Sequence, residues 1–216
     1  MTPNRQPRET WKQYQAGLGA ANRIRVIEAA RKAFATNGYA LSTIDDIARS
    51  AGVTLATLYK HFSGKLDLFG AVVEHGVEEL ALRLDRIDPS EPAAIVLSEL
   101  ARSCGGALRR PANGAVFRII MAEQAQFPEL AEQFQRRAKT PVAAGFAMII
   151  SPLIERGELR GGGIPAIAGL FFGLLELFVV WPQLTDPGWV VSDETVELAV
   201  NNIGRLVLAR YGPDGR

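Results

Sequence analysis

The stretch TIDDIARSAGVTLATLYKHFSGKLDLF, residues 43–69, places two helix starts and one turn within a short distance. Thr43, or Ser42 just before it, can cap a helix whose first turn carries two aspartates, where the helix dipole favours negative charge. Gly52 permits a sharp turn, and Thr54 can then cap a second short helix. Two short capped helices joined by a tight turn predict a helix-turn-helix.

The second of these helices, TLATLYKHF, has the two-sided pattern that reading DNA requires. Leu58 and Phe62 are four residues apart, so both are predicted to face inward. The outward side chains are then expected to enter the major groove, which is roughly 12 Å wide. They are Thr54, Leu55, Thr57, Lys60 and His61, together with Tyr59, whose hydroxyl can reach a phosphate.

Helical periodicity extends to both sides of this stretch. Before it, apolar residues recur at three- and four-residue spacing from Asn22 until Gly38, namely Ile24, Ile27, Ala30, Ala33 and Phe34. After it, a long helix is predicted from Lys65 to about Ile87, followed by helical segments over 92–110, 113–125, 128–157, 164–181 and 192–211. Because no strand pattern is found, the predicted class is all-α: a three-helix DNA-binding domain followed by a larger helical bundle.

We expect three parts along the chain: an N-terminal arm over residues 1–21, the helix-turn-helix domain over 22–68, and an effector-binding and dimerisation domain over 69–216. The arm contains prolines and glycines and shows no apolar period, which is typical of a mobile tail. Its cations, Arg5, Arg8 and Lys12, suit contact with a phosphate or a minor groove, although a disordered tail without a role is the simpler interpretation.

Charge is distributed unevenly along the chain. The net charge is +1, yet residues 1–75 hold ten Lys or Arg against six Asp or Glu, and residues 76–216 hold fourteen against seventeen. A polyanionic partner such as DNA favours the basic end, where the helix-turn-helix is predicted.

The residues in and before this stretch resemble the helix-turn-helix signature of the TetR/AcrR transcriptional regulators. The matching positions are Phe34, Gly38, Thr43, Ile47, Ala48, Gly52, Val53, Leu58, Tyr59, Phe62, Lys65, Leu68 and Phe69. The resemblance implies that Thr43, Thr54, Thr57, Tyr59, His61 and Lys65 contact phosphates or bases of operator DNA. Lys65 would meet a phosphate at the start of the next helix.

Leu55 departs from the family pattern, because a basic or polar residue often stands there. A leucine cannot donate a hydrogen bond to guanine, but it can contact the methyl group of thymine. We therefore include Leu55 among the predicted DNA-binding residues and expect an operator preference unlike that of relatives. Lys60 is included because it is predicted to face outward on the same helix.

The segment RIIMAEQAQFPELAEQF, residues 118–134, resembles the corresponding helix pair of AcrR-type and AefR-type members. The resemblance implies a small-molecule effector pocket, for which large adaptable side chains are suited. The predicted pocket residues are Phe117, Met121, Glu123, Gln124, Phe127, Phe146 and Met148, with Phe134 of the same apolar type. Glu123 and Gln124 are included as polar groups that can orient a ligand, and exposure to water is the alternative for them. Plain core packing is the alternative for each of the apolar residues.

A homodimer is also implied by the resemblance, through the last two helices. The segment LFFGLLELFVVW, residues 170–181, is apolar on nearly every face, and a single chain can cover only one face of it. The predicted interface residues are Phe171, Leu174, Leu175, Phe178, Val196, Val200, Ile203 and Val207.

Other classes of function have little support in the sequence. The lone Cys104 excludes an internal disulfide, and it is either a buried apolar side chain or a redox sensor. The two histidines, His61 and His75, lie too far apart to indicate a metal site, so no metal, cofactor or catalytic residue is predicted. A helical-bundle enzyme using Glu123, His75 or Cys104, a ligand-independent DNA-binding protein, and an activator instead of a repressor remain alternatives. The polar N-terminus and the absence of a long uninterrupted apolar run predict a cytoplasmic protein that does not enter the membrane.

Overall fold

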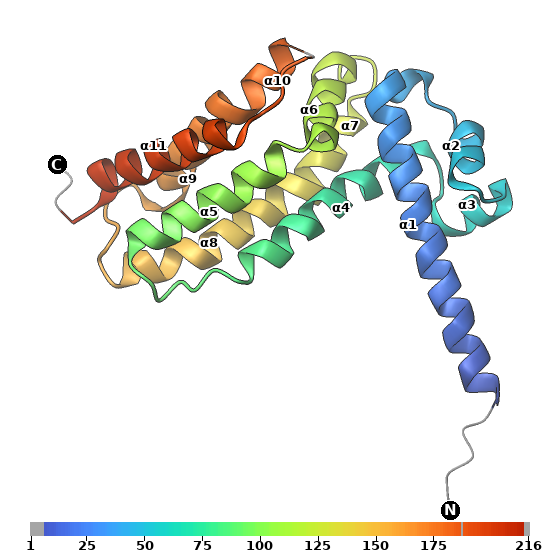
Figure 1. Ribbon diagram of the computed structural model, residues 1–216, viewed down its shortest axis with the longest axis horizontal. Coiled ribbons are helices and arrows are strands. Elements are labelled where there is room, and N and C mark those ends of the chain that lie inside the picture. The colour runs from blue at the N-terminus through green and yellow to red at the C-terminus, as the bar shows by residue number, and fades with distance from the viewer. Residues whose placement is uncertain (1–6, 187, 214–216) are drawn as a thin grey trace, which may run out of the picture. The chain divides into compact units, whose positions relative to one another are not determined.

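The computed structural model describes residues 7–186 and 188–213, and the side chains of residues 17–111, 113–186 and 188–213. Every regular element in this part of the chain is a helix (Figure 1), which confirms the predicted all-α class. The chain divides into two compact units between Val72 and Val73. The unit before this boundary is called unit 1 and the unit after it unit 2.

Unit 1 consists of α1 (Pro7–Leu41), α2 (Ile44–Ala51), α3 (Leu55–His61) and the first turns of α4 (Lys65–Leu84). The backbone of α1 leaves the helical region at Gly38 (φ 78°, ψ 173°), where the sequence predicts a stop. Such a positive φ is readily adopted only by glycine. α1 packs against both α2 and α3 and so braces the helix-turn-helix.

Three aromatic rings form the centre of unit 1. The ring of Phe34 lies 5.7 Å from that of Tyr39 and 5.8 Å from that of Phe69, and the last two rings are 5.6 Å apart. Phe69 belongs to α4, so the first turns of that helix are part of the unit 1 core. For this reason the boundary lies after Val72, whereas the sequence places it after residue 68.

The N-terminal part of the chain differs from the expected arm, because α1 begins at Pro7. Proline is tolerated in the first turn of a helix, where its missing N–H has no partner anyway. The residues that follow are mostly good helix formers, and the glycines at positions 17 and 19 cost only about 1 kcal/mol each. Arg5 and the side chains of Arg8 and Lys12 lie outside the described residues.

In its described residues, unit 2 contains the second part of α4 and seven further α-helices. They are α5 (Ala93–Leu108), α6 (Pro111–Glu123), α7 (Glu129–Phe134), α8 (Thr140–Glu155), α9 (Gly163–Leu175), α10 (Trp181–Thr185) and α11 (Asp193–Tyr211). The π-helical turn η1 (Gln135–Lys139) joins α7 to α8, and η2 (Glu176–Val180) joins α9 to α10. The predicted segments 128–157 and 164–181 are therefore continuous helical rods that contain a π-helical turn.

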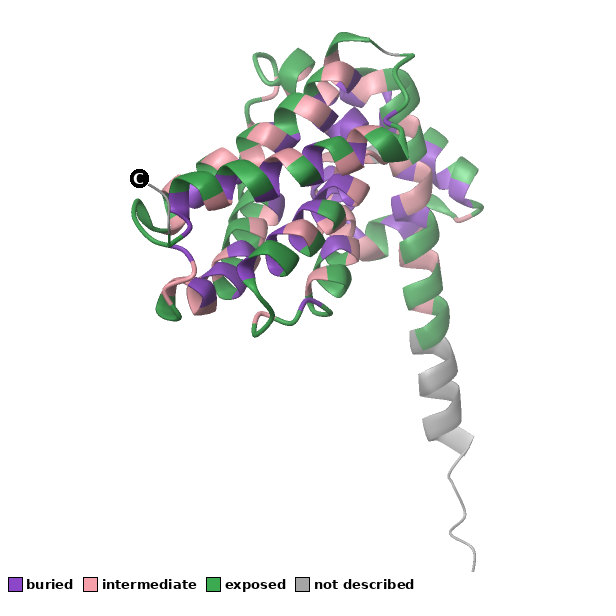
Figure 2. Ribbon diagram, turned by 60° about the vertical axis from the view of Figure 1, so that its left-hand side comes forward, coloured by how far each residue is buried: buried purple, intermediate pink, exposed green. Residues whose placement is uncertain are grey.

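The core of unit 2 lies where α5 packs against α9 and α11, and α8 packs against α9. Figure 2 shows the buried stretches on the inward sides of these helices and the exposed ones outside. The largest fully buried side chains include Leu97, Leu100, Phe146, Ile150 and Phe171. Arg102 of α5 adds an ion pair with Glu197 of α11, with 2.6 Å between Nε and Oε1.

The rod Gly163–Thr185 is long and apolar enough to cross a membrane by length and composition, with a mean hydropathy of 2.1. Only 28% of its most apolar window is buried within the chain. Ile167, Phe171, Leu175 and Val179 point into the core, so one face is covered. The opposite face carries apolar side chains that the chain itself leaves exposed.

Candidate DNA-binding surface and ligand cavity

Two threonines and a glycine fix the helix-turn-helix locally. The hydroxyl oxygen of Thr43 caps α2 by accepting the N–H of Asp46 at 3.1 Å, and that of Thr54 caps α3 by accepting the N–H of Thr57 at 3.1 Å. Between the two helices, Gly52 adopts the left-handed conformation (φ 65°, ψ 37°) that closes α2. These contacts confirm the helix caps and the glycine turn that the sequence predicts.

The helix α3 has one buried and one exposed side, as its sequence predicts. Leu58 and Phe62 are 0% and 2% exposed, whereas Tyr59 is 55% exposed. Phe62 is covered on one side by the guanidinium of Arg23, 5.5 Å from its ring centre. The predicted DNA-contacting residues of the helix-turn-helix are exposed or half-buried on the outer side: Thr43, Thr54, Leu55, Thr57, Tyr59, Lys60 and His61. The side chains are thus available, and their contact with DNA stays a prediction.

Lys65 makes contacts within unit 1 that the sequence does not predict. Its Nζ donates hydrogen bonds to the carbonyl oxygens of Tyr39 (2.9 Å), Ala40 (3.2 Å) and Ser42 (3.1 Å), and it lies 4.4 Å from the centre of the Tyr39 ring. An ammonium has three protons, and here each has a carbonyl acceptor near the negative end of the α1 dipole. The geometry therefore makes Lys65 a brace between α1 and α4, and its contact with a phosphate stays a prediction.

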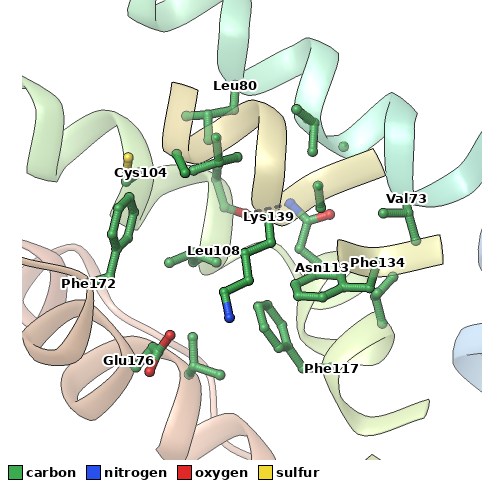
Figure 3. A pocket seen from close by; sticks show the side chains of 18 of the residues that line it. Val73, Leu80, Cys104, Leu108, Asn113, Phe117, Phe134, Lys139, Phe172 and Glu176 are labelled. Atoms are coloured by element: carbon green, nitrogen blue, oxygen red, sulfur yellow. Dashed lines mark hydrogen bonds between the residues drawn. The ribbon is translucent and has the colours of Figure 1, made fainter. Parts of the chain in front are cut away.

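Unit 2 contains a cavity of about 470 Å³, which is within the range of sites for small molecules. The walls are formed by α4, α5, α6, the end of α7, η1, α8, α9 and η2 (Figure 3). Apolar side chains dominate the lining: Val73, Val77, Leu80, Cys104, Ala107, Leu108, Val116, Phe117, Phe134, Ala138, Val142, Ala143, Ala168, Phe172 and Val180. Such a lining suits a ligand with a large apolar body.

The polar lining residues are few: Asn113, Gln135, Lys139 and Glu176. Asn113 is fixed by α5, since its Nδ2 donates to the carbonyl oxygen of Ala107 at 2.8 Å. Its Oδ1 lies so close to Gly76 of α4 that a Cβ there would be only 2.9 Å away. The glycine thus allows α4 and α6 to approach closely in the cavity wall.

Of the seven predicted pocket residues, only Phe117 lines the cavity. Phe146 belongs to the core instead, with its ring 5.1 Å and 5.2 Å from those of Phe171 and Phe172. Met121 and Met148 are 58% and 76% exposed. The remaining three are placed elsewhere too: Glu123, Gln124 and Phe127. The prediction was wrong for these six because residue type, whether large and apolar or polar, does not say toward which side of its helix a side chain points.

The two charged residues of the cavity lining, Lys139 and Glu176, are not among the pocket residues predicted from the sequence. Glu176 is the only charged residue of Gly163–Thr185, and a lone carboxylate in so apolar a helix is the signal that points to it. Lys139 carries no comparable signal, because it follows two other cations in η1.

Six of the eight predicted interface residues are buried within unit 2 itself: Phe171, Leu175, Val196, Val200, Ile203 and Val207. Leu174 and Phe178 are half-buried. The exposed apolar side chains on these helices are instead Leu177 (57%), Trp181 (51%), Leu198 (52%) and Leu206 (39%). The prediction was wrong for the six buried residues because both faces of these helices are apolar, so periodicity does not distinguish the inward face from the outward one. It stays a prediction for Leu174 and Phe178.

The residues proposed for catalysis do not form a site. Cys104 lines the cavity but is 2% exposed, and burial raises the pKa of its thiol to about 12. A thiol with so high a pKa is a poor redox sensor, so the apolar-side-chain interpretation fits better. His75 and Glu123 are not in the cavity lining. Within the described part of the chain, no group of three or more His, Cys, Asp or Glu could hold a metal ion.

A capped helix-turn-helix followed by a separate helical unit with an apolar cavity is the architecture of a transcriptional regulator. Comparison with known families gives the same class. Residues 26–72 match the model described as bacterial regulatory proteins, tetR family, and residues 95–213 match that of the AefR-like transcriptional repressor, C-terminal domain. The chain therefore belongs to the TetR family of transcriptional regulators, as its helix-turn-helix residues predict.

Individual relatives support this assignment. The chain is 29% identical to the HTH-type transcriptional repressor BepR of Brucella suis over 145 residues, covering 65% of this chain and 69% of BepR. It is 28% identical to the HTH-type transcriptional regulator TtgR of Pseudomonas putida over 175 residues, covering 76% of this chain and 83% of TtgR. Matches to two further regulators are confined to 51 residues, and cover 24% and 38% of those proteins.

Among solved structures, a TetR-family transcriptional regulator from Mesorhizobium loti has a TM-score of 0.77 with 25% sequence identity. The superposition covers 90% of this chain and 98% of that protein. The similarity thus extends over both units, and not only over the helix-turn-helix.

Proposed function

We propose that the protein is a cytoplasmic repressor that binds a palindromic operator as a homodimer and is released when a small hydrophobic effector enters the cavity of unit 2. The dimer would place two copies of α3 about one helical turn of DNA apart, roughly 34 Å, so that each reads one half-site. The name of BepR, a transcriptional repressor, favours repression.

The observation that carries this proposal is the course of α4. This helix begins in unit 1 with the brace Lys65, and its later residues Val73, Gly76, Val77 and Leu80 line the cavity. One helix is therefore shared by the DNA-binding unit and the ligand site. A ligand that favours one position of α4 over another would change the distance between the two copies of α3 in the dimer.

Two ion pairs strengthen the connection of α4 to the rest of the cavity wall. Glu74 accepts a hydrogen bond from Arg137 of η1 at 2.7 Å, and Glu79 is paired with Arg110 between α5 and α6. Both pairs are partly exposed, so each is worth little by itself. They join α4 to η1 and to the connection between α5 and α6.

The exposed apolar face of α9, η2, α10 and α11 supports the homodimer. Leu177, Trp181, Leu198 and Leu206 would be covered by the same residues of a second copy in a two-fold contact. Sedimentation velocity tests this part. Leu198→Asp should convert the dimer to a monomer, and a wild-type chain that sediments as a monomer would contradict it.

The DNA and effector parts are tested by fluorescence anisotropy on labelled DNA from upstream of the protein's own gene. Selective binding relative to scrambled DNA of equal length, weakened by salt, is the expected result. Binding no better than to scrambled DNA, also with operators selected from random sequence, would refute the DNA-reading role. A ligand-independent DNA-binding protein is the second candidate, and it would bind the operator equally well with and without every ligand shown to occupy the cavity.

A further inference from the structure

The two charged residues of the cavity wall, Lys139 and Glu176, come from the two π-helical turns of the chain's described part. η1 ends with Lys139, η2 begins with Glu176, and both turns line the cavity. Figure 3 shows the Lys139 side chain reaching toward the side of the cavity on which Glu176 lies. π-helical turns within α-helices are frequent at functional sites because they reposition a side chain at some cost in backbone stability.

These two charges have no ion-pair or hydrogen-bond partner among the residues that the structure describes. Both side chains are exposed, as are Gln135, Ala143 and Gly169 in the same lining, whereas Leu80 and Cys104 are buried. The cavity thus opens on the side of η1, α8 and α9, and its closed end is apolar. A bound ligand would place its apolar body at the closed end and its polar end between the two charges.

A pair of opposite charges sets a requirement on that polar end. A carboxylate would be attracted by Lys139 but would lie against the carboxylate of Glu176, and an ammonium would meet the reverse situation. A neutral hydroxyl avoids both conflicts, because it can donate its hydrogen to Glu176 and accept a hydrogen bond from Lys139.

The remainder of the lining favours an aromatic body. Phe117, Phe134 and Phe172 all line the cavity, and the rings of the first two lie edge to face with centres 5.3 Å apart. Aromatic ligands gain from such rings beyond the area that they bury. At the packing density of protein interiors, about 470 Å³ holds roughly 20 non-hydrogen atoms, the size of two or three fused or linked rings.

We propose that Lys139 and Glu176 act together as a charge filter that selects neutral, hydroxylated aromatic compounds and rejects organic acids and amines of the same shape. This inference rests on the proposed effector role of the cavity. It assigns to that cavity a ligand class and the two residues that determine it.

The test uses three biphenyls that differ only in the polar end: 4-phenylphenol, biphenyl-4-carboxylate and 4-phenylbenzylamine. Isothermal titration calorimetry on the full-length protein without DNA measures each Kd at pH 7, where the phenol is neutral. Because both charges are partly hydrated, we expect wild type to bind the phenol only about tenfold more tightly than the acid or the amine.

Single variants should change the preference in opposite directions. Lys139→Met leaves Glu176 alone and should make the amine the tightest of the three ligands, whereas Glu176→Gln should do so for the acid. The exchange variant Lys139→Glu with Glu176→Lys should restore the preference for the phenol. Glu155→Gln, which removes an exposed carboxylate of α8 outside the cavity lining, is the matched control and should behave as wild type.

The inference is overturned if wild type binds none of the three compounds, or if the order of affinities is the same in both single variants. Helical circular dichroism verifies that each variant is folded. Operator anisotropy measured in parallel distinguishes a failure of the charge filter from a failure of the proposed regulator. Intact operator binding with no charge selectivity refutes only the filter, whereas lost operator selectivity with intact ligand binding refutes only the proposed regulator.

Discussion

Replacing Lys65 by methionine separates the two roles considered for this residue. The substitution keeps the aliphatic length but removes hydrogen bonds to three carbonyl oxygens, those of Tyr39, Ala40 and Ser42, and the contact with the Tyr39 ring. Hydrogen bonds to a charged group contribute about 1.5–3 kcal/mol and a cation–π contact about 0.5–1 kcal/mol. Since Lys65 is half-buried and its bonds share one charge, we expect unit 1 to lose about 2–4 kcal/mol.

Urea unfolding followed by circular dichroism measures this loss, and hydrogen exchange of the amides in α2 and α3 reports on unit 1 separately. Lys60→Met is the matched control, because Lys60 is exposed on the outer side of α3. Lys60→Met should change the free energy of unfolding by no more than about 0.5 kcal/mol. It should also reduce the slope of log operator affinity against log salt concentration by the contribution of about one phosphate contact. The reasoning is refuted if Lys65→Met leaves stability unchanged and lowers the salt slope instead.

Three further predictions concern unit 2. Because the pKa of Cys104 is about 12 against an ordinary 9.0, the native thiol has about a thousandfold less thiolate at pH 8. Iodoacetamide should therefore modify it only after unfolding, and labelling of the native protein at the rate of free cysteine would contradict the burial. Glu158 accepts a backbone N–H at the start of α5 at 2.6 Å, which lowers its pKa below the ordinary 4.5. The stabilisation that the Glu158 carboxylate gives to the fold is complete above pH 4.5 and is lost as the pH falls through the lowered pKa. Glu158→Gln should therefore make the fall in stability at acid pH less steep. An equally steep fall in the variant would be the contrary result. Gly162 has φ +70°, and a Cβ there would lie 2.8 Å from that of Ala166, whereas Gly161 has φ +75° with no atom within 4 Å. Thermal unfolding should show a cost of about 1–2 kcal/mol for Gly161→Ala and a larger one for Gly162→Ala, and equal costs would argue against the close approach.

The helix-turn-helix was predictable because local interactions determine it. Thr43 and Thr54 cap helices through bonds to residues three positions later, and Gly52 supplies a backbone conformation that few other residues adopt. Leu58 and Phe62 face inward because they are four residues apart on a short helix with polar neighbours. Each of these statements needs only a few consecutive residues, so a sequence pattern contains all the information.

The roles of individual side chains in unit 2 were less predictable. Met148 and Phe146 are two residues apart on α8, yet one is 76% exposed and the other 1%. Where a helix is apolar on most sides, as α8 and α9 are, hydrophobic spacing does not tell which side meets the neighbouring helix. The same ambiguity affects the predicted interface, most of whose residues belong to the core.

The sequence by itself determined the family, the helical class and which side of α3 is exposed, because these depend on patterns within a turn or two of helix. Only the tertiary structure showed that Lys65 is bonded to carbonyls more than twenty residues away and that Lys139 and Glu176 share one cavity. A cavity is space that several helices leave between them, so its position depends on how those helices pack and not on any one segment.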